Sequence, residues 1–147
     1  QALLVFTELK AQENMVDLYA SIGEAWLGLG RPVEAGQAGA MAERLLNESN
    51  DNSRTWLPER GRIQRLLGNV AVAQNELQEA ARLLKESAAH FTALGNQLEL
   101  GRSLAALAAL DDKRGDRTAA RLHLSEARLI FRHLGAKLDL KRLEGSS

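Results

Sequence analysis

A ten-residue stretch of this chain occurs twice, and the duplication limits what the chain can fold into. The segment 91–100 returns forty residues later as 131–140, and its Phe, its Gly, its acid and three of its Leu positions all keep their places. A fixed period of this length is typical of stacked helical hairpins, because each hairpin can bury one face only against a neighbour. We therefore predict a helical-repeat array.

The composition favours helix and argues against several functions. Ala and Leu supply about a third of the residues, so intrinsic propensity predicts an all-α chain. The 19 basic and 19 acidic residues cancel, which argues against direct binding of nucleic acid or of an anionic membrane. Cys is absent, so disulfides and thiolate sites are excluded, and we expect a cytoplasmic protein.

Apolar spacing and turn residues divide the chain into a single array of three hairpins. Residues 1–12 are expected to be the tail of a preceding repeat, with a helix over 1–10, and residues 137–147 the start of a further helix with a flexible tail. The repeats themselves are expected over 13–54, 55–96 and 97–136. Their helices are predicted over about 13–29, 32–48, 56–73, 77–94, 97–113 and 117–134.

Local signals mark the helix ends. Gly30 and Gly115 suit the left-handed position after a helix, and Asn75 takes that place in the second hairpin. Thr55 is expected to cap the helix that follows the polar loop 50–54. In the first full helix, three-and-four spacing predicts an inward stripe of Met15, Leu18, Tyr19, Ile22, Trp26 and Leu29.

Large and small residues keep a fixed order within each hairpin. The first hairpin shows the order in full, with Tyr19, Ile22, Gly23, Trp26, Gly30, Ala35 and Ala42. Later hairpins keep part of it, with Leu67, Gly68, Asn75, Ala80 and, at the last small position, Ser87, and then Leu107, Ala108, Gly115, Ala120 and Ala127. This order resembles that of the tetratricopeptide repeat over nearly the whole chain. The resemblance implies a right-handed superhelix of antiparallel hairpins, with a concave groove lined by the first helix of each.

The units also depart from that repeat. They span about 40 to 45 residues rather than 34, and they lack the closing Pro. These features, with the duplicated ending, look more like the extended helical repeats of bacterial LuxR-type, MalT-like transcription regulators and of adenylate or guanylate cyclases and kinases. In such proteins the array resembles a sensor or partner-binding arm.

The sequence contains no recognisable catalytic motif. Gly28-Leu29-Gly30 has no Lys-Ser or Lys-Thr after it, so a phosphate loop is excluded. Acidic pairs such as Asp111 and Asp112 are interpreted as a solvated face or as ion pairs. The histidines lack His-Glu-x-x-His spacing and are interpreted as ordinary helix residues: His90, His123 and His133. We predict no enzyme activity, no cofactor and no metal.

The resemblance places a candidate partner site in the groove. Arg62, Arg65 and Asn69 share one helical stripe, and Arg102 follows in the next hairpin, so guanidinium groups could converge on a carboxylate or phosphate. The alternative is a solvated basic stripe paired with neighbouring acids. The predicted partner-binding residues are Asp17, Glu24, Arg62, Arg65, Asn69, Arg102 and Asp112. The groove is also expected to expose Ala20, Leu27, Val72, Ala105 and Ala109.

These features favour a non-catalytic protein-interaction or regulatory segment of a larger bacterial signalling protein, with a peptide or partner domain in its groove. The alternatives are a small-effector-sensing arm of a MalT-like transcription regulator and a regulatory arm of a cyclase or kinase. Neighbouring domains of the parent chain are further expected partners. The sequence also allows a homodimer, formed through apolar residues that we expect to be exposed at the two ends of the array: Leu3, Leu4, Phe6, Leu138 and Leu140.

Overall fold

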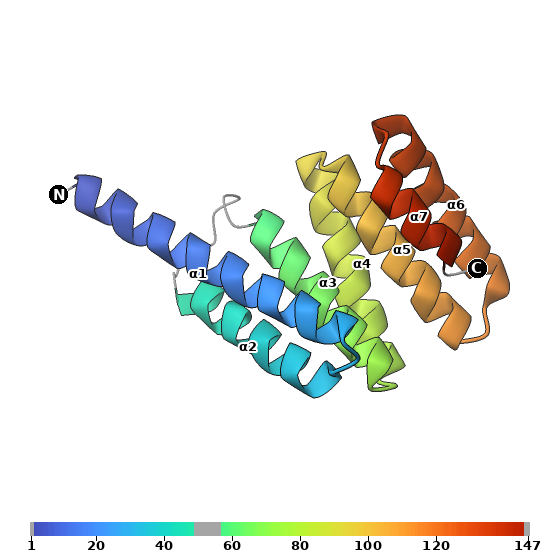
Figure 1. Cartoon of the computed structure of the whole chain (residues 1–147), viewed down its shortest axis with the longest axis horizontal. Helices are drawn as coiled ribbons and strands as arrows, with labels where there is room; N and C mark the ends of the chain where they lie inside the picture. Colours follow the sequence, from blue (N-terminus) through green and yellow to red (C-terminus); the bar gives the residue numbers. More distant parts are fainter. Residues whose placement is uncertain (1, 49–56, 146–147) are drawn as a thin grey trace.

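Seven α-helices make up the computed structural model, which describes residues 2–48 and 57–145 (Figure 1). In order they are α1 (Ala2–Gly28), α2 (Pro32–Glu48), α3 (Leu57–Ala73), α4 (Leu77–Leu94), α5 (Gln97–Lys113), α6 (Arg117–Leu134) and α7 (Lys137–Gly145). Within these residues there is no strand, and none of the helices combines the length and the hydropathy of a membrane-spanning segment. The predicted all-α class is confirmed, while the right-handed superhelix stays a prediction. Thr55 and the loop 50–54 lie outside the described residues.

Successive helices pack as hairpins, α1 with α2, α3 with α4 and α5 with α6, and the hairpins lie side by side in chain order (Figure 1). The short helix α7 then packs on α6. Because α3 contacts both α1 and α5, the first helices of the hairpins form one face of the molecule. This face carries the candidate site.

The duplicated stretch contains the same helix-ending turn twice. Gly95 and Gly135 have φ values of 67° and 69°, and in each copy the N–H of the following residue donates to the carbonyl of Phe91 or Phe131. Inside the second hairpin, Asn75 takes a φ of 62°. The sequence prediction for Asn75 is therefore confirmed, because Asn enters the left-handed region more readily than most residues.

The repeated phenylalanine packs against a glycine of the partner helix. A Cβ atom on Gly61 would lie 2.7 Å from the ring of Phe91, and the third hairpin repeats this pair. The equivalent positions of the first hairpin hold Val16 and Leu46, which belong to one buried cluster. The first hairpin therefore divides the volume at this position between its two helices differently from the second and third hairpins.

The helix α1 is continuous, so the predicted break between residues 1–10 and 13–29 is wrong. Where the duplicated stretch ends its helix at Gly95, the first hairpin has Lys10, which prefers to continue a helix. The residues that follow, Ala11-Gln12-Glu13, are also good helix formers. As a result the N-terminal part of α1 extends past the end of α2 (Figure 1).

The buried face of α1 also differs from the predicted stripe. Val16, Ala20 and Gly23 are buried, and a Cβ on Gly23 would lie 2.5 Å from a Leu66 methyl carbon. Small residues dominate this face because α3 passes close to it. Four of the six residues predicted to point inward are exposed instead: Met15, Leu18, Ile22 and Leu29. Apolar residues thus lie on two sides of α1, and spacing alone does not show which side is packed.

Candidate functional site

A hollow of about 650 Å³ lies on the face formed by the first helices, and α1, α3, α5 and α7 all contribute to its lining. Four of the seven predicted partner-binding residues line it: Glu24, Arg65, Asn69 and Arg102. Asp17 and Arg62 line a smaller hollow of about 200 Å³. Asp112 lines a third hollow, of about 850 Å³, between α5, α6 and α7. The structure therefore divides the predicted site over three hollows.

Two arginines of the predicted site bind a carboxylate of the chain itself. Nη2 of Arg65 lies 2.6 Å from Oε2 of Glu99, and Nη1 of Arg102 lies 2.8 Å from Oε1 of the same residue. Glu99 thus occupies the place between the guanidinium groups where a ligand carboxylate was expected. Burial opposes ionisation of Glu99, but the charges and hydrogen bonds of Arg65 and Arg102 together outweigh burial, and the pKa of Glu99 is lowered.

Asp139 binds the other side of Arg102. The Nε of Arg102 donates to Oδ1 of Asp139 at 2.9 Å, and this aspartate is buried. Asp139 and Glu99 occupy equivalent places in the two copies of the duplicated stretch, in the first turns of α7 and α5. The acid that repeats in the sequence therefore joins successive hairpins, by pairing with an arginine of the preceding first helix. The repetition was visible in the sequence, but its arginine partners were not.

Two buried serines continue this network behind Arg65. The Oγ of Ser87 donates to the Gly61 carbonyl at 2.7 Å and lies 2.9 Å from the Oγ of Ser103. Arg65 donates to Ser103 at 3.3 Å, and its guanidinium lies 5.6 Å from the ring centre of Phe91. Sequence reasoning placed Ser87 at a small-residue position and missed its polar role. Arg65 is thus held in place by the fold.

Arg62 is paired with α1. Its Nε donates to Oε1 of Glu24 at 2.6 Å, its Nη2 donates to Ser21 at 2.9 Å, and its Nη1 lies 3.8 Å from Asp17. This is the pairing that the alternative interpretation of the basic stripe expected. All three arginines of the predicted site are therefore neutralised by carboxylates of the chain.

Asn69 differs from these arginines, because its amide makes no hydrogen bond to any described residue. It lines the 650 Å³ hollow, where Leu27 and Ala105 add apolar surface. An amide side chain offers both a donor and an acceptor. Two other residues expected in the groove pack against the core instead: Ala20 is buried and Val72 is partly buried.

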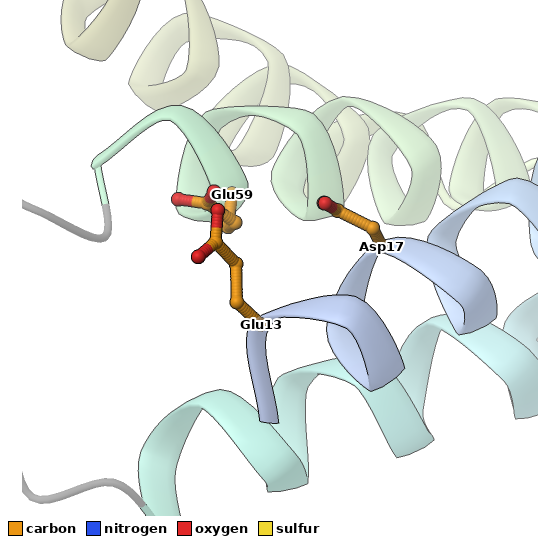
Figure 2. Close-up of side chains that lie close together, drawn as sticks. All are labelled: Glu13, Asp17 and Glu59. Carbon is orange, nitrogen blue, oxygen red and sulfur yellow. The ribbon is translucent and has the colours of Figure 1, made fainter. Parts of the chain in front are cut away.

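Three carboxylates that the sequence did not connect meet between α1 and α3, and Figure 2 shows them: Glu13, Asp17 and Glu59. Their ligand oxygens lie within 4.8 Å of one another, and no other described group of His, Asp and Glu has such spacing. Burial raises the pKa of Glu59, and the charges of Asp17 and Glu13 add to this effect. Carboxylate oxygens are ligands for Ca²⁺ and Mg²⁺. Acidic groups also gather without an ion, and Asp17 faces Arg62 as well.

The histidines are not brought together. Nδ1 of His123 lies 2.6 Å from Oδ2 of Asp111, and Nδ1 of His90 lies 2.7 Å from the Gln64 side-chain oxygen. Asp111 is buried and bonded to His123, so the interpretation of a solvated face is wrong for Asp111. These contacts join neighbouring helices.

Neither a scan against protein-family models nor a search of curated proteins finds a match for this chain. The resemblance to tetratricopeptide repeats, and the narrower one to MalT-like regulators, therefore stay predictions. What the chain does must be inferred from its own geometry.

Proposed function

We propose that the chain is a non-catalytic interaction module that binds an extended segment of a partner protein in the hollow along α1, α3, α5 and α7. The observation that carries this proposal is one hollow lined mainly by α1, α3, α5 and α7, with the Asn69 amide, which has no hydrogen-bond partner among the described residues, in its wall. The backbone of a covered peptide needs hydrogen-bond partners, and this amide can both donate and accept. Leu27 and Ala105 offer apolar contact to the peptide's side chains.

The ion pairs of Arg65 and Arg102 in the hollow disfavour a strongly anionic ligand. Arg65 and Arg102 are neutralised by Glu99 and Asp139, so a strongly anionic ligand would have to compete with these carboxylates. The hollow is also open to solvent, whereas small-molecule sites enclose most of their ligand. Both observations favour a peptide over a small anionic effector. The setting that we propose, a regulatory segment of a cytoplasmic bacterial signalling protein, comes from the resemblance alone.

Ala105→Arg tests the hollow directly. Arg65 stands at the equivalent position of the second hairpin, so the fold already accepts an arginine there. Peptides enriched from a displayed random library on the wild-type chain should share a motif, and A105R should weaken their binding at least about tenfold. Ala105→Ser is the matched control, because it leaves the hollow open and should bind as the wild type does.

Two results would contradict this proposal. Enriched peptides that bind A105R as tightly as the wild type would locate the site elsewhere. Saturable thermal stabilisation by a small anionic metabolite, lost in A105R and without any peptide binding, would support the effector-sensing alternative instead.

A further inference from the structure

The helix α1 carries a second apolar face, which no described helix covers. We call it the outer seam: Leu4, Glu8, Ala11, Met15, Leu18, Ile22, Ala25 and, just after the helix, Leu29. All of these residues are exposed, Leu18 by 53% and Leu29 by 72%, and Glu8 is the only charged one. The seam lies about 140° around the helix from the buried residues of α1, so it points away from α2 and α3.

The spacing of the outer seam is that of a helix that pairs with another helix along its length. Its positions alternate strictly by four and three residues, which keeps one narrow row facing a partner. A helix that packs on a body by one side needs a single apolar stripe, whereas α1 has two on nearly opposite sides. A partner for the seam should be a helix with matching spacing, and a second copy of α1 supplies one.

We propose that two copies of the chain pair through their outer seams, with the two α1 helices antiparallel. In this register Met15 of one copy faces Leu18 of the other, near the centre of the seam. Outward from the centre, Ala11 faces Ile22, Glu8 faces Ala25, and Leu4 faces Leu29. Small residues therefore lie opposite larger ones, and each layer joins an a position to a d position.

The charges of the seam favour the antiparallel orientation. In a parallel pair the two Glu8 carboxylates would meet within the interface and repel each other. In the antiparallel pair each Glu8 lies beside the small Ala25, which leaves its carboxylate room to reach solvent. One flank of the seam is also small and uncharged, so the two helices can approach without like-charge repulsion: Thr7, Asn14, Ser21 and Gly28.

The seam is long enough for a specific interface. Two helices paired over about 40 Å bury on the order of 1,000 Å² of surface in total. This area is at the lower limit for a specific protein–protein interface. The proposal does not depend on the peptide-binding hollow. Three residues of α1 line the hollow, of which Glu24 and Leu27 lie on other sides of the helix, and Gly28 lies on the flank of the seam and is not one of its apolar positions.

Sedimentation of the whole 147-residue chain tests the pairing. The mass should rise from the 16.1 kDa of one chain to twice that value with concentration. The double variant Leu18→Glu with Ile22→Glu should raise the dissociation constant at least about tenfold and keep its helical circular dichroism, since both positions are exposed. Leu122→Glu with Leu129→Glu, on exposed leucines of α6, is the matched control and should dimerise as the wild type does.

Orientation is tested by cross-linking, which is clean because the chain has no cysteine. An oxidised mixture of Met15→Cys and Leu18→Cys chains should form a covalent dimer faster than either variant alone. Ala25→Lys should tighten the antiparallel dimer, by placing a lysine opposite Glu8 of the other copy.

Three outcomes would overturn the proposal. The first is a chain that stays monomeric at about 500 µM, a concentration that would reveal even a weak dimer. The second is a dimer that L18E with I22E leaves intact. The third is fastest cross-linking of M15C with itself, which would indicate a parallel pair. A monomer whose seam instead captures a different helix would show that the occupant is another protein.

Discussion

At the scale of single residues, two glutamates have opposite effects on the folded state. Glu99 lies between Arg65 and Arg102, which favour its charge and lower its pKa. Glu59 lies beside Asp17 and Glu13, and burial with these charges raises its pKa. Its Oε2 atom is buried and has no hydrogen-bond partner among the described residues. The fold is therefore stabilised by one ionised carboxylate and destabilised by the other.

Glu59→Gln should stabilise the chain at neutral pH. The raised pKa means that the folded state disfavours the ionised carboxylate. Replacing it by the neutral amide should therefore raise the free energy of unfolding by about 0.5 kcal/mol, a figure that allows for solvent screening. The gain should disappear as the pH falls through the raised pKa of Glu59 towards 4.5, because the wild-type residue then takes up a proton. Urea unfolding at a series of pH values measures this, and a gain that does not depend on pH would contradict the electrostatic cause.

Glu99→Gln should have the reverse sign. The charge of Glu99 contributes to stability above its unfolded pKa of 4.5, and this contribution is lost as the pH falls through the lowered folded value. We expect the variant to lose about 1 kcal/mol of unfolding free energy at pH 7, a figure that allows for the partial exposure of Glu99 to solvent. The difference from the wild type should become smaller below pH 4.5. Glu79→Gln breaks an exposed ion pair with Arg82 and is the control that should change little. An equal loss in both variants would count against a special role for Glu99.

At the scale of elements, the two helices of a hairpin pack against each other at one crossing point. The contact there depends on the summed volume of the two side chains that face each other. The second hairpin fills this crossing with Gly61 and Phe91, and the first fills it with Val16 and Leu46. A glycine within a helix costs about 0.5 to 1 kcal/mol relative to alanine. Its presence at position 61 is explained by the ring that lies against it, because a Cβ there would be 2.7 Å from that ring.

Exchanging these pairs tests the volume rule. Gly61→Val alone should destabilise the chain by about 1 to 3 kcal/mol through overpacking, and Phe91→Leu alone by about 1 kcal/mol or more through a cavity. The double variant reproduces the pair of the first hairpin and should lose less than the sum of the two, by at least about 0.5 kcal/mol. Chemical unfolding of the four chains gives this coupling, and additive losses would show that the two positions do not share one space.

At the scale of the whole molecule, the two ends of the array differ in chemistry. The surface of the second hairpin that receives α5 is apolar, with Ala71, Val72, Leu77 and Ala81. The equivalent positions of the third hairpin are Asp111, Asp112, Arg117 and Arg121. Of the two leucines expected to be exposed near this end, Leu138 is exposed, but Leu140 packs against the core. The third-hairpin surface thus has less need of an apolar partner, whereas the outer seam of α1 still requires one.

The sequence by itself determined the all-α class and nearly all helix ends. Those features depend on neighbours in the chain, such as the left-handed turn at Asn75 or the repeated Gly95 and Gly135. The one helix end that was predicted wrongly, near residue 10, also depends on neighbours in the chain, because Lys10 stands where the duplicated stretch has its Gly.

Only the tertiary structure decided which side of α1 is buried and which charges are paired. Both sides of α1 are apolar, so its burial depends on where α2 and α3 pack, which no pattern within α1 records. Glu99 and Asp139 become partners of the arginines because successive hairpins bring α5 onto α3 and α7 near α5. Packing between distant segments thus turned a predicted ligand site into internal ion pairs, and it left a predicted core stripe as a surface.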